Sequence, residues 1–168
     1  MTWVRILVGA VWLNGAAEKI LNPQFPQQFA QSIKAGGYVS QAPQWFQAFM
    51  KTNVVPNAEL YANLTRAGEL ALGIALLLGL LTNLAALGSI AFSLMMLVSL
   101  GGFGFGVGLG PPEFLNINLI IALLSLLVLI SARAKDLSLD AAISQDRPLI
   151  SPLLTNRRAG GGNGQDKV

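Results

Sequence analysis

Ionisable side chains inside apolar segments are the first candidates for chemistry in this sequence, because a charge is costly to place in a membrane. Arg66 and Glu69 are three residues apart and share one helix face. A carboxylate beside a guanidinium can bind or protonate a quinone headgroup, or bind a small oxyanion. The alternative is a set of ion pairs near the membrane interface, with Lys19 and Arg66 reaching outward. The candidate polar pocket comprises Glu18, Lys19, Arg66, Glu69 and Glu113.

The absence of cysteine and histidine limits that chemistry. It excludes disulfides, zinc fingers, iron–sulfur clusters and histidine-ligated haem within these residues, and no metal site is expected. Met95 and Met96 do not replace them, because adjacent residues point about 100° apart on a helix. We expect these methionines to pack in the core or against lipid. Any redox role must use a diffusible carrier, quinone being the candidate, or the cofactor of a partner.

The composition predicts a membrane environment. Hydrophobic residues make up 53% of the chain and charged residues only 11%, whereas soluble domains carry about 25% charged residues. Four segments have the roughly 20 apolar residues that a spanning helix needs, at about 3–21, 61–81, 84–100 and 114–130. The predicted fold is all-α: an integral membrane four-helix bundle over residues 1–143, with a long loop after the first helix. The net charge of +3 comes from scattered residues, so nucleic acid is not an expected partner.

The positive charges predict the orientation. Arg5 precedes the first apolar run, and Arg133 and Lys135 follow the last one, so both termini should be cytoplasmic. Lys34 and Lys51 in the long loop argue weakly against this. The orientation places the five pocket candidates at one outer level. We expect a multi-pass protein of the inner (plasma) membrane or an equivalent energy-transducing membrane. A cleaved signal peptide is the less favoured interpretation of the first segment.

The connections between the helices also carry predictions. The long loop over residues 22–60 is proline-rich and has an aromatic segment, QWFQAFM, which predicts a membrane-hugging cap with a short interfacial helix. The polar tail, 144–168, should end in disorder. The segment DLSLDAAIS before it predicts a short surface helix.

Small residues at four-residue spacing predict close helix contacts in lipid. The link Thr82-Asn83 is short, so the second and third helices should form a tight hairpin. We expect the small residues to pack within the bundle; the alternative is an interface with a partner or a second copy. They are Ala85, Ser89 and Ser93 on the third helix, and Ala67, Ala71 and Ala75 on the second.

Glycine alternates with apolar residues in the segment GGFGFGVGLG. It lacks the spacing and flanking elements of a phosphate-binding loop. The segment is either a flexible connector or a loop that contacts the membrane surface or a partner. Its interface candidates are Gly102, Phe103, Phe105 and Gly108.

Three pieces of the sequence together resemble the DoxX family. They are RILVGAVWLNGAAEKIL, RAGELALGIALLLGLLTNLAALG and LSLDAAIS, and they span most of residues 3–143. The resemblance implies a four-helix membrane protein related to DoxD, the membrane subunit of a thiosulfate:quinone oxidoreductase. The residues that match by position are Arg5, Gly15, Lys19, Gly68, Glu69, Gly73 and Asp140.

Two functions are compatible with these observations. The first is a subunit that anchors or braces a larger respiratory or photosynthetic redox complex through contacts with other membrane subunits. The alternative is a quinone-reactive subunit of a thiosulfate:quinone oxidoreductase type of enzyme. Because the chain has no cofactor ligands of its own, the first function is the primary expectation. A small-solute transporter ranks last, since no inverted repeat or broken helix is evident.

Overall fold

The computed structural model describes residues 1–35, 39–99, 117–131 and 138–140. Within these ranges the protein is helical and no strand is present. Four long helices run along the molecule: α1 (Thr2–Leu21), α4 (Ala58–Leu78), α5 (Thr82–Ser99) and α6 (Ile117–Ile130). Their bounds lie within a few residues of the four predicted apolar segments. In the described ranges α5 is the one helix both long and apolar enough to cross a membrane, and α6 is apolar but shorter.

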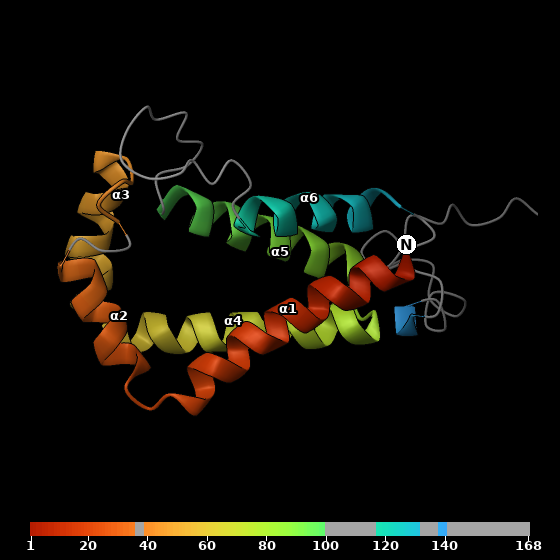
Figure 1. The fold of residues 1–168 in the computed structure, drawn as a ribbon, viewed down its shortest axis with the longest axis horizontal. Helices are drawn as coiled ribbons and strands as arrows, with labels where there is room; N and C mark the ends of the chain where they lie inside the picture. The colour runs from red at the N-terminus through yellow and green to blue at the C-terminus, as the bar shows by residue number, and fades with distance from the viewer. Residues whose placement is uncertain (36–38, 100–116, 132–137, 141–168) are drawn as a thin grey trace, which may run out of the picture.

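The long helices form two pairs, α1 with α4 and α5 with α6. The pairs lie close together at the end that carries the N-terminus, and they separate toward the end that carries α2 and α3 (Figure 1). The predicted hairpin of α4 and α5 is present, but Thr82 and Asn83, predicted as its link, are the first two residues of α5. These helices are joined by a short turn at 79–81, but each packs more extensively against its other neighbour.

Glycines decide which helices approach most closely. A Cβ atom added to Gly73 would lie 2.6 Å from Leu13 Cδ2, and one added to Gly9 would lie 2.8 Å from the backbone nitrogen of Leu77. The α1 and α4 backbones therefore pack at distances that no larger residue permits. Ala67 and Ala71, expected to serve this purpose, face outward from the bundle and are exposed.

The long loop after α1 folds into a helical cap. It consists of α2 (Phe25–Lys34), α3 (Gln44–Phe49) and the π-helix η1 (Met50–Val54), so the predicted short helix at QWFQAFM is present as α3 and the start of η1. Ile33, Val39, Ala42, Phe46 and Val54 form its own small core.

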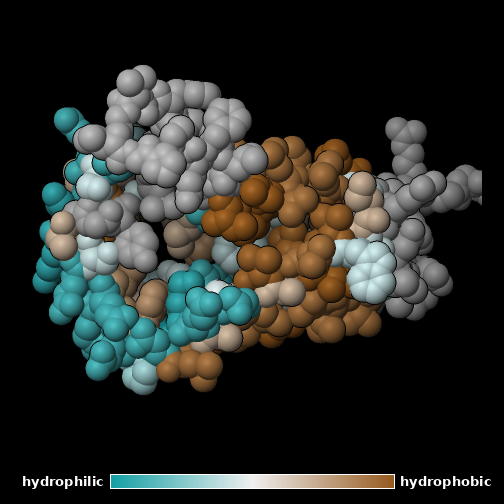
Figure 2. Space-filling model, viewed as in Figure 1, coloured by the Kyte–Doolittle hydropathy of each residue, from teal (hydrophilic) through white to brown (hydrophobic). Residues whose placement is uncertain are grey.

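The outer surface of the cap is polar and the middle of the four long helices is apolar (Figure 2). On α2, Phe29 and Ile33 turn inward, whereas Gln27, Gln31 and Lys34 are exposed. This amphipathic arrangement matches a helix that lies between water and an apolar interior. The interfacial position of the cap stays a prediction.

The opposite end of the bundle, which we term the closed end, is held by a buried polar network of Arg5, Asp140 and the α4–α5 turn. Arg5 Nη1 donates to the carbonyl oxygens of Leu76 and Leu77, at 2.6 and 3.1 Å. The Asp140 carboxylate accepts from the amides of Leu81 and Thr82, at 2.8 and 2.6 Å. Arginine thus satisfies the carboxyl end of α4 and aspartate the amino end of α5, as the helix dipoles favour.

The predicted short helix at DLSLDAAIS is present where the structure describes it, since Leu139 and Asp140 are helical, but its predicted place on the surface is only partly correct. Ser138 and Asp140 are buried against the α4–α5 turn, although Leu139 is exposed. The turn needs this contact, because Gly79 and Leu81 both have positive φ, 68° and 47°. That conformation is uncommon for leucine, and the bond from the Leu81 amide to Asp140 stabilises it. The polar tail at 144–168 lies outside the described residues.

Candidate functional site

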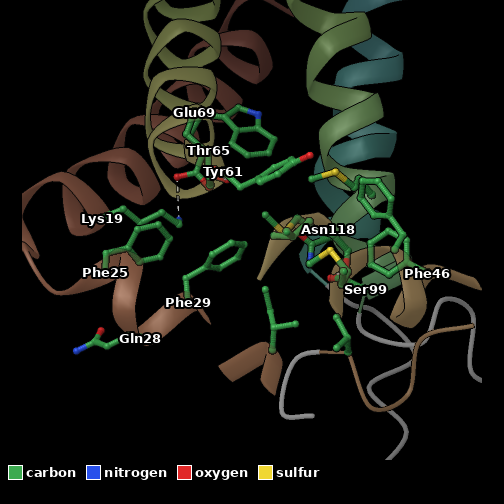
Figure 3. A pocket seen from close by; sticks show the side chains of 18 residues that line it. Lys19, Phe25, Gln28, Phe29, Phe46, Tyr61, Thr65, Glu69, Ser99 and Asn118 are labelled. Atoms are coloured by element: carbon green, nitrogen blue, oxygen red, sulfur yellow. Dashed lines mark hydrogen bonds and ion pairs between the residues drawn. The ribbon is translucent and has the colours of Figure 1, made fainter. Parts of the chain in front are cut away.

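A cavity of about 500 Å³ lies between the two helix pairs, beneath the cap. Figure 3 shows α1 and α4 on one side of it and α5 and α6 on the other. Its volume falls within the range of about 300–1,000 Å³ typical of small-molecule sites. The described side chains that line it include Trp12, Lys19, Phe25, Phe29, Phe46, Phe49, Met50, Tyr61, Thr65, Glu69, Met95, Met96 and Asn118.

The lining is mainly aromatic and apolar, with one ion pair. Lys19 Nζ lies 2.8 Å from Glu69 Oε2 and also donates to the Gly15 carbonyl oxygen, at 3.2 Å. The Glu69 side chain is 4% exposed and that of Lys19 is 24% exposed. Among the described lining residues these are the only two that carry a charge, so their charges cancel within that part of the lining.

The ion pair retains unused hydrogen-bonding capacity. An ammonium group has three N–H donors, and Lys19 uses two of them within the described part of the chain. The second carboxylate oxygen of Glu69 has no hydrogen-bond partner among the described residues, and the same holds for the Tyr61 hydroxyl. The Tyr61 ring extends from α4 toward the α5–α6 side of the cavity (Figure 3). A ligand in this space can accept hydrogen bonds from Lys19 and from the Tyr61 hydroxyl, and it can donate one to the second oxygen of Glu69.

Glycine makes the position of the pair possible. A Cβ atom on Gly15 would lie 3.1 Å from Glu69 Oε2 and 3.5 Å from Lys19 Nζ. Gly15 therefore leaves room for the carboxylate to reach across from α4 to α1.

The structure brings together only part of the predicted polar pocket. Lys19 and Glu69 meet at the cavity. Lys19 turns inward rather than reaching outward, because it is bonded to the buried carboxylate. Glu18 is exposed and accepts a hydrogen bond from Asn14. Glu113 lies outside the described residues.

Arg66 does not line the cavity. Its three guanidinium nitrogens donate to the carbonyl oxygens of Lys19 and Asn22 and to the side chain of Asn63. These bonds use three of its five N–H donors and hold α1 and the start of the cap against α4. The position of Arg66 outside the cavity lining gives no support to its predicted role as an anion-binding group there.

The small residues of α5 pack inside the bundle, as predicted. Ala85, Ser89 and Ser93 are all buried. Trp12 Nε1 donates to Ser89 Oγ at 2.7 Å, and Ser89 Oγ lies 2.7 Å from Ser125 Oγ. These bonds connect α1, α5 and α6 below the cavity. The glycine-run candidates Gly102, Phe103, Phe105 and Gly108 lie outside the described residues.

Sequence reasoning missed the aromatic and methionine lining. Phe25 and Phe29 are four residues apart on α2, and their ring centres are 5.8 Å apart. That spacing predicts that both rings lie on one face of a helix. The two rings form a wall of the cavity only because the cap lies over the bundle. Met95 and Met96 were expected to serve packing alone, and both also line the cavity.

The DoxX family model matches residues 1–102 of this chain, which is more than half of its length. The protein therefore belongs to the DoxX family of membrane proteins. No curated protein and no solved structure matches it.

The residues that carried the resemblance lie in the contacts described above. Gly15, Lys19 and Glu69 build the ion pair, and Gly73 allows the close α1–α4 contact. Arg5 and Asp140 build the closed end. Gly68 lies beside Phe92, with room for a Cβ atom at 3.6 Å.

Proposed function

We propose that this DoxX protein is a multi-pass membrane subunit that binds a quinone in the cavity between its helix pairs. The observation that carries the proposal is the Lys19–Glu69 ion pair in a cavity wall whose described lining is otherwise mainly apolar and aromatic. Ligand sites generally combine such a lining with a few polar groups that orient the ligand. A quinone matches this combination, because it joins an apolar ring and tail to carbonyl oxygens.

The ion pair favours a quinone over an oxyanion such as thiosulfate. Glu69 would repel an anion next to Lys19, and the guanidinium of Arg66 is already bonded within the protein. A neutral carbonyl oxygen needs only the third N–H donor of Lys19. The reduced form, a quinol, can also donate a hydroxyl to the second oxygen of Glu69. An oxyanion substrate would then react on a partner subunit.

The arrangement of the ends supports the proposed topology. In Figure 1 the N-terminus and residues 138–140 lie at the same end of the bundle, and the cap lies at the other end. Four spans with both termini on the cytoplasmic side agree with this, and the polar cap then faces the outer aqueous phase. The apolar band over the long helices corresponds to the lipid-facing region (Figure 2).

Fluorescence of Trp12 tests quinone binding directly, because Trp12 lines the cavity. Trp3 and Trp45 are 77% and 67% exposed, so replacing both with phenylalanine leaves Trp12 as the one emitter at little cost in stability. The protein in lipid nanodiscs is titrated with ubiquinone-1 and with a short-chain menaquinone. We expect saturable quenching, and a loss of affinity of roughly tenfold on Lys19→Gln, the value of a charge-assisted hydrogen bond.

A quinone dissolved in the lipid also quenches tryptophan, but it does so linearly and without saturation. Linear quenching that is identical in the unsubstituted protein and in Lys19→Gln would contradict the proposal. Lys51→Gln is the matched control, since it removes an exposed lysine charge from the cap without touching the cavity. Thiosulfate at millimolar concentration should not compete with ubiquinone-1.

A role as an anchoring subunit of a redox complex is the second candidate. It is favoured by the outward-facing small residues Ala67 and Ala71 on α4, which permit close approach of a partner helix. Since the chain has no cysteine or histidine, electrons from a bound quinol would have to pass to a partner's cofactor. Gentle extraction from native membranes, with identification of the co-purifying subunits, tests this candidate.

A further inference from the structure

The carboxyl end of α1 needs hydrogen-bond donors that its own backbone does not supply. The last carbonyl groups of an α-helix have no partner within the helix, and the helix dipole attracts a cation to them. Many helices solve this with a left-handed residue after the last turn. In α1 the capping residue, Asn22, is extended instead, with φ −99° and ψ 100°. The Phe25 amide donates to the Asn22 carbonyl oxygen at 3.1 Å, and side chains of other elements can supply further donors.

Arg66 on α4 supplies two such donors. Its Nε donates to the Lys19 carbonyl oxygen at 2.9 Å, and its Nη2 donates to the Asn22 carbonyl oxygen at 2.7 Å. Its guanidinium carbon also lies 5.3 Å from the centre of the Phe25 ring, within the range of a cation–π contact. One side chain thus fixes the end of α1 and the beginning of the cap against α4.

The carbonyl oxygen that accepts from Arg66 Nε belongs to Lys19, whose side chain lines the cavity. Lys19 Nζ is held between Glu69 and Gly15, and its backbone is held by Arg66. Ligand-binding groups lose effect when they are displaced by about 1 Å. The position of the Lys19 ammonium therefore depends on Arg66, although Arg66 itself does not line the cavity.

The opposite end of the same helix pair provides a natural control. α1 and α4 run antiparallel (Figure 1), and each gives an arginine to the carboxyl end of the other. Arg5 on α1 donates to the carbonyls of Leu76 and Leu77. Both arginines stabilise the carboxyl end of a helix. Only Arg66 bonds to a residue, Lys19, whose side chain lines the cavity.

We infer that Arg66 is a positioning residue for the quinone site, acting through the backbone of Lys19. This inference rests on the proposed function, because quinone affinity is its readout. Lysine is not an equivalent substitute, since its single ammonium lacks the planar fork that reaches two carbonyls at once.

A double-mutant cycle on ubiquinone-1 affinity tests the inference in the Trp12-only protein. We expect Arg66→Gln to weaken binding roughly fivefold and Lys19→Gln roughly tenfold. The double variant should bind within about twofold of Lys19→Gln alone, because residues that act through one another are not additive. Arg66→Lys should give a smaller loss than Arg66→Gln, and it keeps the cycle measurable if the glutamine variant does not fold.

Arg5→Lys is the matched control for Arg66→Lys. It should lower thermal stability at least as much, because Arg5 is fully buried, and it should leave ubiquinone-1 affinity within about twofold of the unsubstituted value.

Three outcomes would overturn the inference: additive losses of roughly fiftyfold in the double variant, an unchanged affinity in Arg66→Gln, or an equal loss of affinity in Arg5→Lys. Absence of saturable quenching in the unsubstituted protein would instead refute the proposed function, so the two failures are distinguishable.

Discussion

The closed end and the cavity end of the bundle use similar residues for different purposes. At each end an arginine from one helix of the α1–α4 pair caps the carboxyl end of the other. At the closed end Asp140 binds two backbone amides, one with each carboxylate oxygen. At the cavity end Glu69 has one oxygen on Lys19. Its other oxygen has no hydrogen-bond partner within residues 1–35, 39–99, 117–131 and 138–140.

We infer from this difference that the buried polar groups of the two ends have different roles, one structural and one in the proposed ligand binding. A buried charge whose oxygen atoms are all bonded within the protein is costly to deprive of a partner. A buried charge with unused capacity beside an open volume can satisfy a ligand instead. Between the two ends, the bonds among Trp12, Ser89 and Ser125 connect α1 with α5 and α6. We therefore expect substitutions at the closed end to change stability and those at the cavity end to change binding.

Asp140→Ala should have the largest effect on stability. It leaves the amides of Leu81 and Thr82 without their acceptor, and it removes the charge that interacts with the buried Arg5. We expect a loss of about 3–5 kcal/mol, the value for breaking a buried charged network, with ubiquinone-1 affinity unchanged in the folded fraction. Unfolding in mixed micelles measures the first quantity and Trp12 quenching the second. A loss of ubiquinone-1 affinity without a loss of stability would contradict the proposed division into a structural end and a binding end.

Gly73→Ala should force α1 and α4 apart. Its new Cβ atom would meet the Leu13 backbone nitrogen at 2.9 Å, and overpacking of this kind costs about 1–3 kcal/mol. Gly68→Ala is the matched control on the same helix, because its nearest neighbour, Phe92, lies at 3.6 Å. That variant should be neutral or slightly stabilising, by about 0.5–1 kcal/mol. Equal stability of the two variants in thermal unfolding would contradict the close helix contact.

Lys19→Met should separate stability from binding at the cavity end. It leaves Glu69 unpaired, and we expect a loss of about 1–3 kcal/mol, less than for a fully buried pair because Lys19 is 24% exposed. The double variant Lys19→Met/Glu69→Leu should recover most of this stability, since an apolar pair avoids the desolvation cost. Ubiquinone-1 affinity should fall roughly tenfold or more in both. An unchanged affinity in the stable double variant would show that the ion pair is not the binding group.

Ser125→Ala should have the smallest effect. It removes the partner of Ser89 on α6, but Ser89 keeps its bond from Trp12. We expect a loss of about 0.5–1.5 kcal/mol, typical of one neutral hydrogen bond. Ubiquinone-1 affinity should stay the same, because Ser125 does not line the cavity. A large change in Trp12 emission without ligand would show that this bond controls the cavity wall.

The predicted positions of the long helices agree with the structure because apolar segments of this length have few alternatives. The short helix at Gln44–Phe49 was also predicted, from the aromatic residues of its segment. The pairing of α1 with α4 and of α5 with α6 was not predicted. The sequence predicted only a hairpin of α4 and α5, because any of the apolar helix faces could have met. The alanines of α4 have the spacing of a contact face, yet the closest approach is at Gly9 and Gly73, where the backbones themselves meet.

The sequence by itself determined the helical class, the membrane character, the absence of cysteine and histidine ligands, and the few residues in which ionisable chemistry is possible. Only the tertiary structure decided their roles. Lys19 and Glu69 are 50 positions apart, and Arg5 and Asp140 are 135 positions apart. Each pair meets because the α1–α4 packing and the α4–α5 turn bring distant segments together. Charge type and local spacing do not tell a structural basic residue from one at a cavity. The neighbours supplied by the fold place Arg66 at the end of α1 and Lys19 in the cavity wall.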